Sequence, residues 1–224
     1  MIKNILFDLD DTIFDFKRAE KIALSKTLSE LGVSPNDRIL SRYSEINISQ
    51  WKLLEKRIIT RDEVKVRRYK LLFEEFGIDL SAERTTALYE KNLAIGHYFI
   101  DGAEELLQRL YKDYRLYLVS NGATAVQKSR IASSGIEKYF QNIFISQEIG
   151  YDKPAKEFFD KCFEQIEDFS KKETIIVGDS LSSDIQGGIN AGIKTVWFNP
   201  RHLEFDKIKP DYEISSLDEL NALR

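Results

Sequence analysis

Asp8-Leu9-Asp10-Asp11-Thr12 follows directly on the apolar run Ile5-Leu6-Phe7, which is typical of a buried β-strand. Three carboxylates within four residues repel one another and resist desolvation unless a cation or hydrogen-bond donors compensate their charge. The carboxyl end of a strand is also where open α/β sheets bind their ligands. An acidic turn that caps a helix, with Thr12 as the cap, is the alternative interpretation. The stretch favours an α/β fold with a ligand site after its first strand.

Short β-type runs alternate with helical patterns along the rest of the chain. The runs lie at residues 116–119, 143–145, 174–177, 195–198 and, more weakly, 212–214. The helical patterns lie at residues 103–111, 124–134, 155–166 and 184–191, and Gly135 and Gly192 follow two of them as C-terminal caps should. This alternation predicts a Rossmann-like parallel sheet with helices on both faces.

The region 16–100 contains no convincing strand. Its helix signals are a stop at Gly32, a capped start at Ser34-Pro35, a stop at Gly77 and a start after Ser81. The sequence therefore predicts two domains. Residues 1–15 plus 101–224 form an α/β catalytic core, and residues 16–100 form an inserted all-helical cap.

Composition narrows the range of partners. A formal net charge of -4 gives no support for nucleic acid or a membrane surface as the main partner. The one cysteine, Cys162, excludes an internal disulfide framework and a cysteine-based zinc site. No apolar run is long enough to span a bilayer, and the first residues lead into a strand and not into a signal peptide. We expect a cytoplasmic protein that is a monomer or a weak homo-oligomer.

Three further groups of polar residues follow predicted strands. Ser120-Asn121-Gly122 offers a hydroxyl, an amide and a glycine backbone to phosphate oxygens, although a capping turn explains it equally well on its own. Lys153 precedes Pro154 and a helix, where its charge would suit a phosphate, and a solvated surface lysine is the alternative. Asp179 follows Gly178 and supplies the oxygen ligand that magnesium prefers, while Asp184 is either part of that site or a helix cap.

In this order, these motifs resemble those of the haloacid dehalogenase-like (HAD) hydrolase superfamily. Asp8-x-Asp10-x-Thr12 matches the first motif, Ser120 the second, Lys153 the third, and Gly178-Asp179 with Asp184 the fourth. The helical block stands where one branch of the superfamily carries its cap. Residues 119–122, 146–154 and 178–192 look most like bacterial pyrimidine 5′-nucleotidases, and phosphoglycolate and other sugar-phosphate phosphatases share much of that pattern. Asp11 stands where many relatives have glycine.

The resemblance implies a magnesium-dependent phosphatase that hydrolyses a small phosphomonoester through an aspartyl phosphate. Its catalytic residues would be Asp8 as nucleophile, Asp10 as general acid and base, and Lys153. The substrate phosphate would be bound by Lys153, Ser120, Asn121 and the backbone N–H of Asp11. Magnesium would be held by Asp8, Asp179 and the backbone carbonyl of Asp10, with Asp184 supporting the metal site and Thr12 orienting Asp10.

The resemblance favours a nucleoside 5′-monophosphate as the substrate. The alternatives are a phosphoglycolate or sugar-phosphate phosphatase, a phosphomutase, and a non-catalytic phosphate- or metal-binding module. Asp10 argues against a dehalogenase, because those members of the superfamily lack the second aspartate. Trp51, in the helical block, could stack on a base, but packing within the block is the favoured interpretation.

Overall fold

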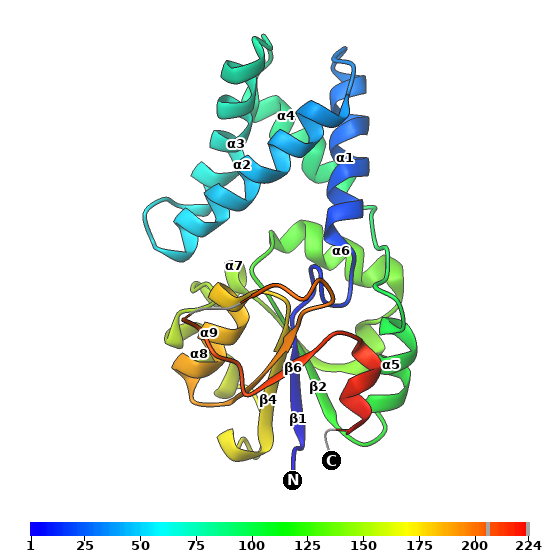
Figure 1. Ribbon diagram of the computed structural model, residues 1–224, viewed down its shortest axis with the longest axis vertical. Coiled ribbons are helices and arrows are strands. Elements are labelled where there is room, and N and C mark those ends of the chain that lie inside the picture. Colours follow the sequence, from blue (N-terminus) through cyan, green and yellow to red (C-terminus); the bar gives the residue numbers. More distant parts are fainter. Residues whose placement is uncertain (205–206, 223–224) are drawn as a thin grey trace. The chain divides into compact units, whose positions relative to one another are not determined.

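The computed structural model describes residues 1–204 and 207–222, and it divides into two compact units (Figure 1). One unit combines Met1–Asp15 with His97–Arg224 and is built from strands and helices. The other, Phe16–Gly96, is entirely helical among its regular elements. No helix of the described ranges is long and apolar enough to cross a membrane.

Six parallel strands form the sheet of the α/β unit, as the sequence predicted. They are β1 (Asn4–Phe7), β2 (Arg115–Ser120), β3 (Phe140–Ile145), β4 (Thr174–Gly178), β5 (Lys194–Phe198) and β6 (Tyr212–Ile214), in the order β3-β2-β1-β4-β5-β6. β2 and β3 follow on one side of β1, and β4, β5 and β6 then follow on its other side. The strand order therefore reverses beside β1, and such a switch point at the carboxyl ends is where α/β sheets bind ligands.

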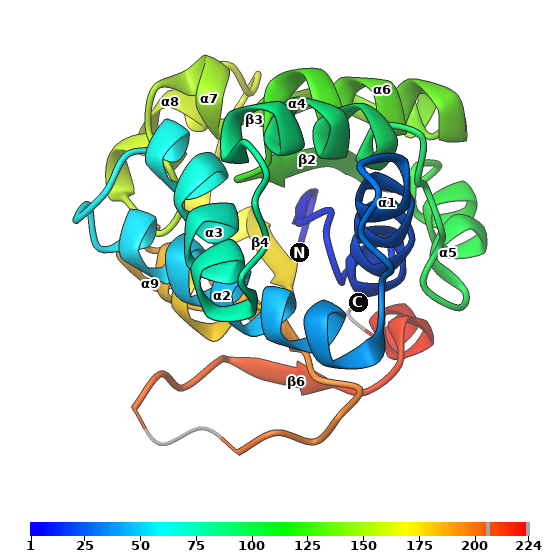
Figure 2. The same ribbon diagram turned by 90° about the horizontal axis from the view of Figure 1, so that it is seen from above.

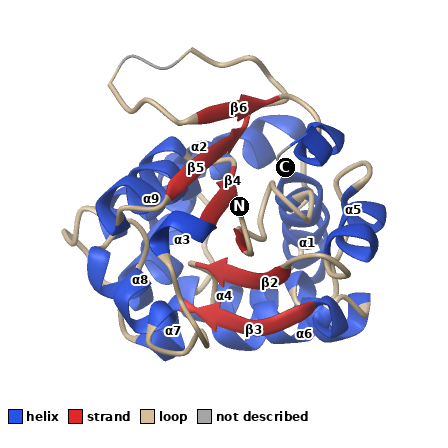
Figure 3. Ribbon diagram, turned by 90° about the horizontal axis from the view of Figure 1, so that it is seen from below, coloured by secondary structure: helices blue, strands red, loops and turns tan. Residues whose placement is uncertain are grey.

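Helices cover both faces of the sheet (Figure 3). The helical elements of this unit are α5 (Ala103–Leu110), α6 (Thr124–Ser134), η1 (Glu137–Tyr139), α7 (Ser146–Ile149), α8 (Lys156–Phe163), η2 (Lys171–Glu173), the π-turn η3 (Leu181–Ile185), α9 (Gln186–Ala191) and η4 (Leu217–Ala222). Successive strand residues point to opposite faces, so Phe7 joins a core with Leu106 of α5, whereas Leu6 joins a core with Phe158 of α8. Burial on both faces explains why the strands are apolar throughout.

The helical unit contains α1 (Phe16–Glu30), α2 (Asp37–Glu55), α3 (Arg61–Phe76) and α4 (Ala82–Leu93), with α2 packed on α3 and α1 packed on α4 (Figure 2). The predicted end of α3 at Gly77 and the Ser81 cap of α4 are confirmed. The predicted start of α2 is wrong, because Asn36 and not Ser34 caps it by accepting the N–H of Ile39. Proline after Ser34 had suggested the earlier start.

The chain returns from the helical unit to the α/β unit earlier than the sequence indicated. Residues 97–100, expected in the helical block, belong to the α/β unit. Phe99 forms an isolated bridge with Phe14, and their ring centroids lie 5.3 Å apart. The N–H of Asp15 donates to the carbonyl of Tyr98. This pairing is too short to leave an alternating pattern in the sequence.

Candidate active site

The chain turns sharply where β1 ends. The N–H of Asp8 still donates to the Val177 carbonyl of β4, at 2.9 Å, so Asp8 extends the strand by one residue. The N–H groups of Ile13 and Phe14 then both donate to the carbonyl of Leu9. Asp11 takes φ 59°, a left-handed conformation that aspartate tolerates better than most residues. This turn carries Asp8 and Asp10 off the end of the central strand.

Lys153 is buried among oxygen acceptors. Its Nζ donates to Asp8 Oδ1 at 2.6 Å, to Asp184 Oδ1 at 2.7 Å and to the Val119 carbonyl at 2.8 Å. Burial works to lower the pKa of Lys153, but the Asp184 and Asp8 carboxylates raise it above its usual range. Burial raises the pKa of Asp8 to about 8, and the charges of Asp184 and Asp10 add to the rise while Lys153 opposes it. A fixed positive charge therefore lies against the Asp8 carboxyl.

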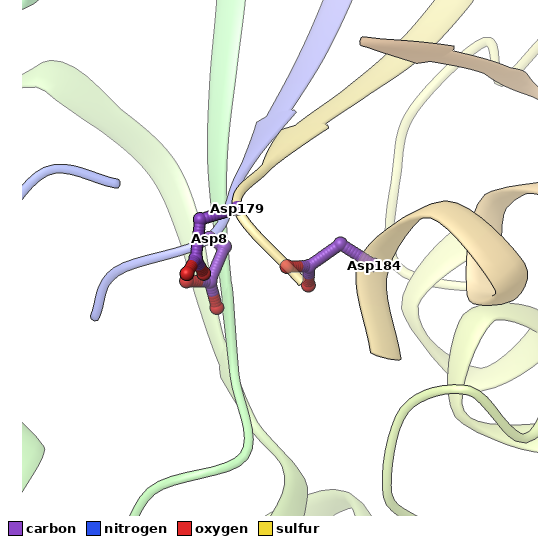
Figure 4. A group of neighbouring side chains, drawn as sticks. All are labelled: Asp8, Asp179 and Asp184. Carbon is purple, nitrogen blue, oxygen red and sulfur yellow. The ribbon is translucent and has the colours of Figure 1, made fainter. Parts of the chain in front are cut away.

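Three carboxyl groups converge at the ends of β1 and β4 (Figure 4). Oxygen atoms of Asp8, Asp179 and Asp184 all lie within 4.8 Å of one another. The indole N–H of Trp197 donates to the Asp179 carbonyl at 2.8 Å and fixes the backbone that carries this carboxylate. Hard oxygen donors at this spacing fit a cation such as magnesium, whose charge would add to that of Lys153 in offsetting the carboxylates. The structure thus brings together the predicted metal residues Asp8 and Asp179.

Both oxygens of Asp184 already have partners. Oδ1 accepts from Lys153, and Oδ2 accepts the N–H of Ser180 at 3.1 Å. A Cβ added to Gly178 would lie 2.4 Å from Asp184 Oδ2, so glycine is required there for this close approach. Asp184 consequently stabilises Lys153 and the loop after β4, which fits a supporting position.

The Asn121 side chain pairs with the backbone of Lys153. Its Oδ1 accepts the Lys153 N–H at 2.9 Å, and its Nδ2 donates to the Lys153 carbonyl at 2.9 Å and to Ser183 Oγ at 3.3 Å. An amide nitrogen has two hydrogens, and both are used. The side chain of Asn121 therefore positions Lys153 in this structure, and its role in binding phosphate stays a prediction.

Ser120 is oriented as a hydrogen-bond donor. Its buried Oγ accepts the N–H of Gly122 at 3.1 Å and the Nε2 of Gln127 at 2.9 Å. A hydroxyl has two acceptor positions and one proton, so the proton is what Ser120 can offer to a further ligand. This arrangement fits a phosphate oxygen.

The Asp10 carboxylate is not one of the three clustered carboxylates and is held by α6. Arg130 Nη1 donates to Oδ1 at 2.5 Å, and Gln127 Nε2 donates to Oδ2 at 2.6 Å. The sequence prediction missed both partners. A signal existed, because Gln127 and Arg130 stand three residues apart in the helix that follows Ser120-Asn121-Gly122 and therefore share a face.

Two predicted roles in the first motif are not supported. The Thr12 hydroxyl is buried and has no hydrogen-bond partner among the residues that the structure describes, so it does not orient Asp10 through such a bond. The N–H of Asp11 donates to the Phe14 carbonyl at 2.7 Å and is consumed by the turn. In the described part of the chain, the N–H groups of Leu9 and Asp10 find no acceptor, which makes them the backbone donors of this turn.

His97 and Trp51 both pack or pair with neighbouring residues of their own unit. His97 Nδ1 pairs with the Ser133 hydroxyl at 2.9 Å. Trp51 packs against the small apolar cluster of Leu54, Ile59 and Val64 within the helical unit. This packing is the role that the sequence favoured for Trp51.

Known proteins are similar to this chain in sequence and in fold. The sequence model of a family described as haloacid dehalogenase-like hydrolase matches residues 5–198. The chain is 41% identical over 220 residues to the pyrimidine 5′-nucleotidase PynA of Streptococcus pneumoniae, covering 97% of this chain and 93% of that protein. It is 30% identical over 220 residues to the pyrimidine 5′-nucleotidase YjjG of Escherichia coli, covering 98% and 96%.

A solved structure matches over nearly the whole length. It is the magnesium-bound crystal structure of the HAD-hydrolase YfnB from Bacillus subtilis. The TM-score is 0.95 at 38% sequence identity, and the match covers 99% of this chain and 98% of that chain.

Proposed function

Because this chain belongs to the haloacid dehalogenase-like hydrolase family and is a phosphoric monoester hydrolase, we propose that it hydrolyses a small phosphomonoester through an aspartyl phosphate on Asp8. The observation that carries this proposal is the 2.6 Å contact between Lys153 Nζ and Asp8 Oδ1 in a buried site. A carboxylate that attacks a phosphate dianion is repelled by it. A buried ammonium beside the attacking oxygen offsets that repulsion.

In the first step, an Asp8 carboxylate oxygen attacks phosphorus and the bond to the leaving oxygen breaks. Asp10 gives a proton to the leaving oxygen, which departs as an alcohol. Lys153, the Ser120 hydroxyl and the N–H groups of Leu9 and Asp10 bind the oxygens of the transferring group, with these two amides replacing that of Asp11. The second step reverses the role of Asp10. Its carboxylate takes a proton from water, which attacks phosphorus and releases phosphate from Asp8.

Magnesium fits the site on the chemistry of its donors. The carboxylates of Asp8 and Asp179 and the backbone carbonyl of Asp10 would hold it, as hard oxygen ligands. When bound, the ion supplies positive charge against the phosphate oxygens and the carboxylates. The magnesium in the YfnB structure supports this assignment.

Pyrimidine nucleoside 5′-monophosphates are the proposed substrates. The support is the identity of 41% and 30% to two pyrimidine 5′-nucleotidases over nearly the whole chain. We expect kcat/KM for uridine or thymidine 5′-monophosphate to exceed that for phosphoglycolate and hexose phosphates by at least about tenfold, since polar groups that recognise one leaving group disfavour another. The measurement is phosphate release from a panel of esters, with the Asp8→Asn variant as the control for contaminating phosphatases. A sugar phosphate or phosphoglycolate at the head of the panel would replace the nucleotidase proposal.

The role of Asp10 gives a further prediction. Asp10→Asn should lower kcat/KM for an alkyl phosphate by about 10²–10⁴-fold, the usual contribution of general acid catalysis. A dinitrophenyl phosphate should be much less affected in its first step, because its leaving group departs without a proton. Stopped-flow release of dinitrophenolate, compared with phosphate release from the alkyl ester, measures the difference. Equal losses on both esters would contradict the proton-donor assignment.

A further inference from the structure

We propose that Gln127 and Arg130 of α6 are positioning residues that hold the Asp10 carboxyl in place for proton transfer. This inference rests on the proposed role of Asp10 in the phosphatase reaction. The main observation is that both carboxylate oxygens of Asp10 accept a hydrogen bond from this pair. Arg130 donates at 2.5 Å and Gln127 at 2.6 Å. Arg130 also donates to the Oε1 of Gln127 at 2.9 Å.

Arg130 fixes which way the Gln127 amide faces. A guanidinium can only donate, so the oxygen of the amide must face Arg130 and its nitrogen must face away. That nitrogen has two hydrogens, which go to Asp10 Oδ2 and to Ser120 Oγ. The orientation of one amide is thus determined by its chemistry, and it joins Asp10 to Ser120.

Burial makes the pair rigid. The Arg130 side chain is fully buried and Gln127 is 1% exposed, whereas the Asp10 side chain remains 27% exposed. The guanidinium carbon of Arg130 lies 5.1 Å from the centroid of the Phe14 ring, in the turn that carries Asp10. Asp10 is therefore anchored from its buried side and keeps an exposed side toward solvent. A proton donor held in one orientation reaches its target without an entropy cost at each turnover.

The same pair also orients the Ser120 hydroxyl, through Gln127. With Gln127 and Gly122 occupying the acceptor positions of Ser120 Oγ, only the proton is left for a ligand. The α6 pair consequently arranges a proton donor for the leaving oxygen and a hydrogen-bond donor for the phosphoryl group. The effect of the pair on proton donation can be separated from its effect on phosphoryl binding by comparing a leaving group that needs a proton with one that does not.

The test uses Gln127→Met and Arg130→Met, which keep side-chain volume and remove the hydrogen bonds. Lys128→Met on the same helix is the matched control, because Lys128 is exposed and pairs with Glu148. For each protein, kcat/KM is measured on 2,4-dinitrophenyl phosphate and on the alkyl phosphate that the wild type hydrolyses fastest. We expect the alkyl-to-aryl ratio to fall at least about tenfold in both α6 variants and to stay within about twofold of wild type in the control.

The ratio is independent of how much of each preparation is folded, because both esters report on the same active fraction. If Arg130→Met yields no soluble protein, Gln127→Met decides alone, and Arg130→Lys should recover part of the ratio by restoring one donor and its charge. An unchanged ratio in Gln127→Met overturns the positioning role, whether activity falls equally on both esters or not at all. Asp10→Asn separates the two proposals. If its ratio also stays unchanged, the proton-donor role of Asp10 fails as well.

Discussion

Asp8→Asn is expected to lower kcat by at least about a thousandfold, as deletion of a covalent nucleophile does. Asparagine keeps the shape of the side chain and removes the attacking oxygen anion. The measurement is steady-state phosphate release with a saturating ester, on protein whose circular dichroism matches the wild type. Asp113→Asn, which changes an exposed carboxylate of the same unit, is the control and should leave kcat unchanged. A variant that keeps a tenth of the wild-type turnover would remove Asp8 from the mechanism.

The same substitution should change how the stability of the fold depends on pH when no divalent cation is bound. Burial raises the pKa of Asp8 to about 8 in the folded protein, above the ordinary aspartate value. The contribution of Asp8 to stability is therefore full below about pH 4 and is lost as the pH rises toward about 8. The substituted asparagine does not ionise, so the variant escapes this loss. The margin is the Tm of the variant minus the Tm of the wild type, and in chelator we expect it to grow from about pH 5 to about pH 8. A margin that shrinks over this range would contradict the burial argument.

Removal of divalent cations is expected to abolish turnover, and magnesium should restore it. Three carboxyl groups whose oxygens lie within 4.8 Å leave negative charge where a phosphate must bind. Calcium should bind but support little turnover, because its larger and looser coordination misplaces the reacting groups. The measurement is phosphate release after exhaustive chelation and readdition of each ion.

Asp179→Ala tests the same site through one ligand. It should raise the magnesium concentration for half-maximal activity by at least about tenfold, since a carboxylate ligand is lost. Isothermal calorimetry of magnesium binding gives a second readout that does not depend on turnover. Full activity after chelation, or unchanged magnesium affinity in the variant, would contradict the metal assignment.

Most of the fold was predictable from the sequence, and so was the gathering of the candidate site residues at one edge of the sheet. Parallel strands bring their carboxyl ends to one edge, so polar residues after 5–7, 116–119 and 174–177 had to meet there. The alternation of apolar strands and capped helices was long enough to define the sheet. The bridge between Phe14 and Phe99 is too short to leave a pattern in the sequence. For that reason the sequence extends the helical block to residue 100, whereas the helical unit ends at Gly96.

The hydrogen-bond partners within the site were not predictable. Asn121, Thr12 and the Asp11 N–H were assigned by residue type, but local turns decide which donors are already used. Gln127 stands 117 residues from Asp10 in the chain, so their contact depends on how α6 lies beside the first motif. Sequence spacing identifies which residues face one side of a helix and does not identify what that side meets.

The most direct test of the phosphatase mechanism is a burst measurement on Asp10→Asn with 2,4-dinitrophenyl phosphate and magnesium. This leaving group needs no proton, so the first step should proceed, whereas the second step lacks its base. We predict a rapid release of about one dinitrophenolate per active site, and mass spectrometry of the quenched protein should find phosphate on Asp8. Steady release of dinitrophenolate with no burst and no phosphate on Asp8 would contradict the aspartyl-phosphate mechanism.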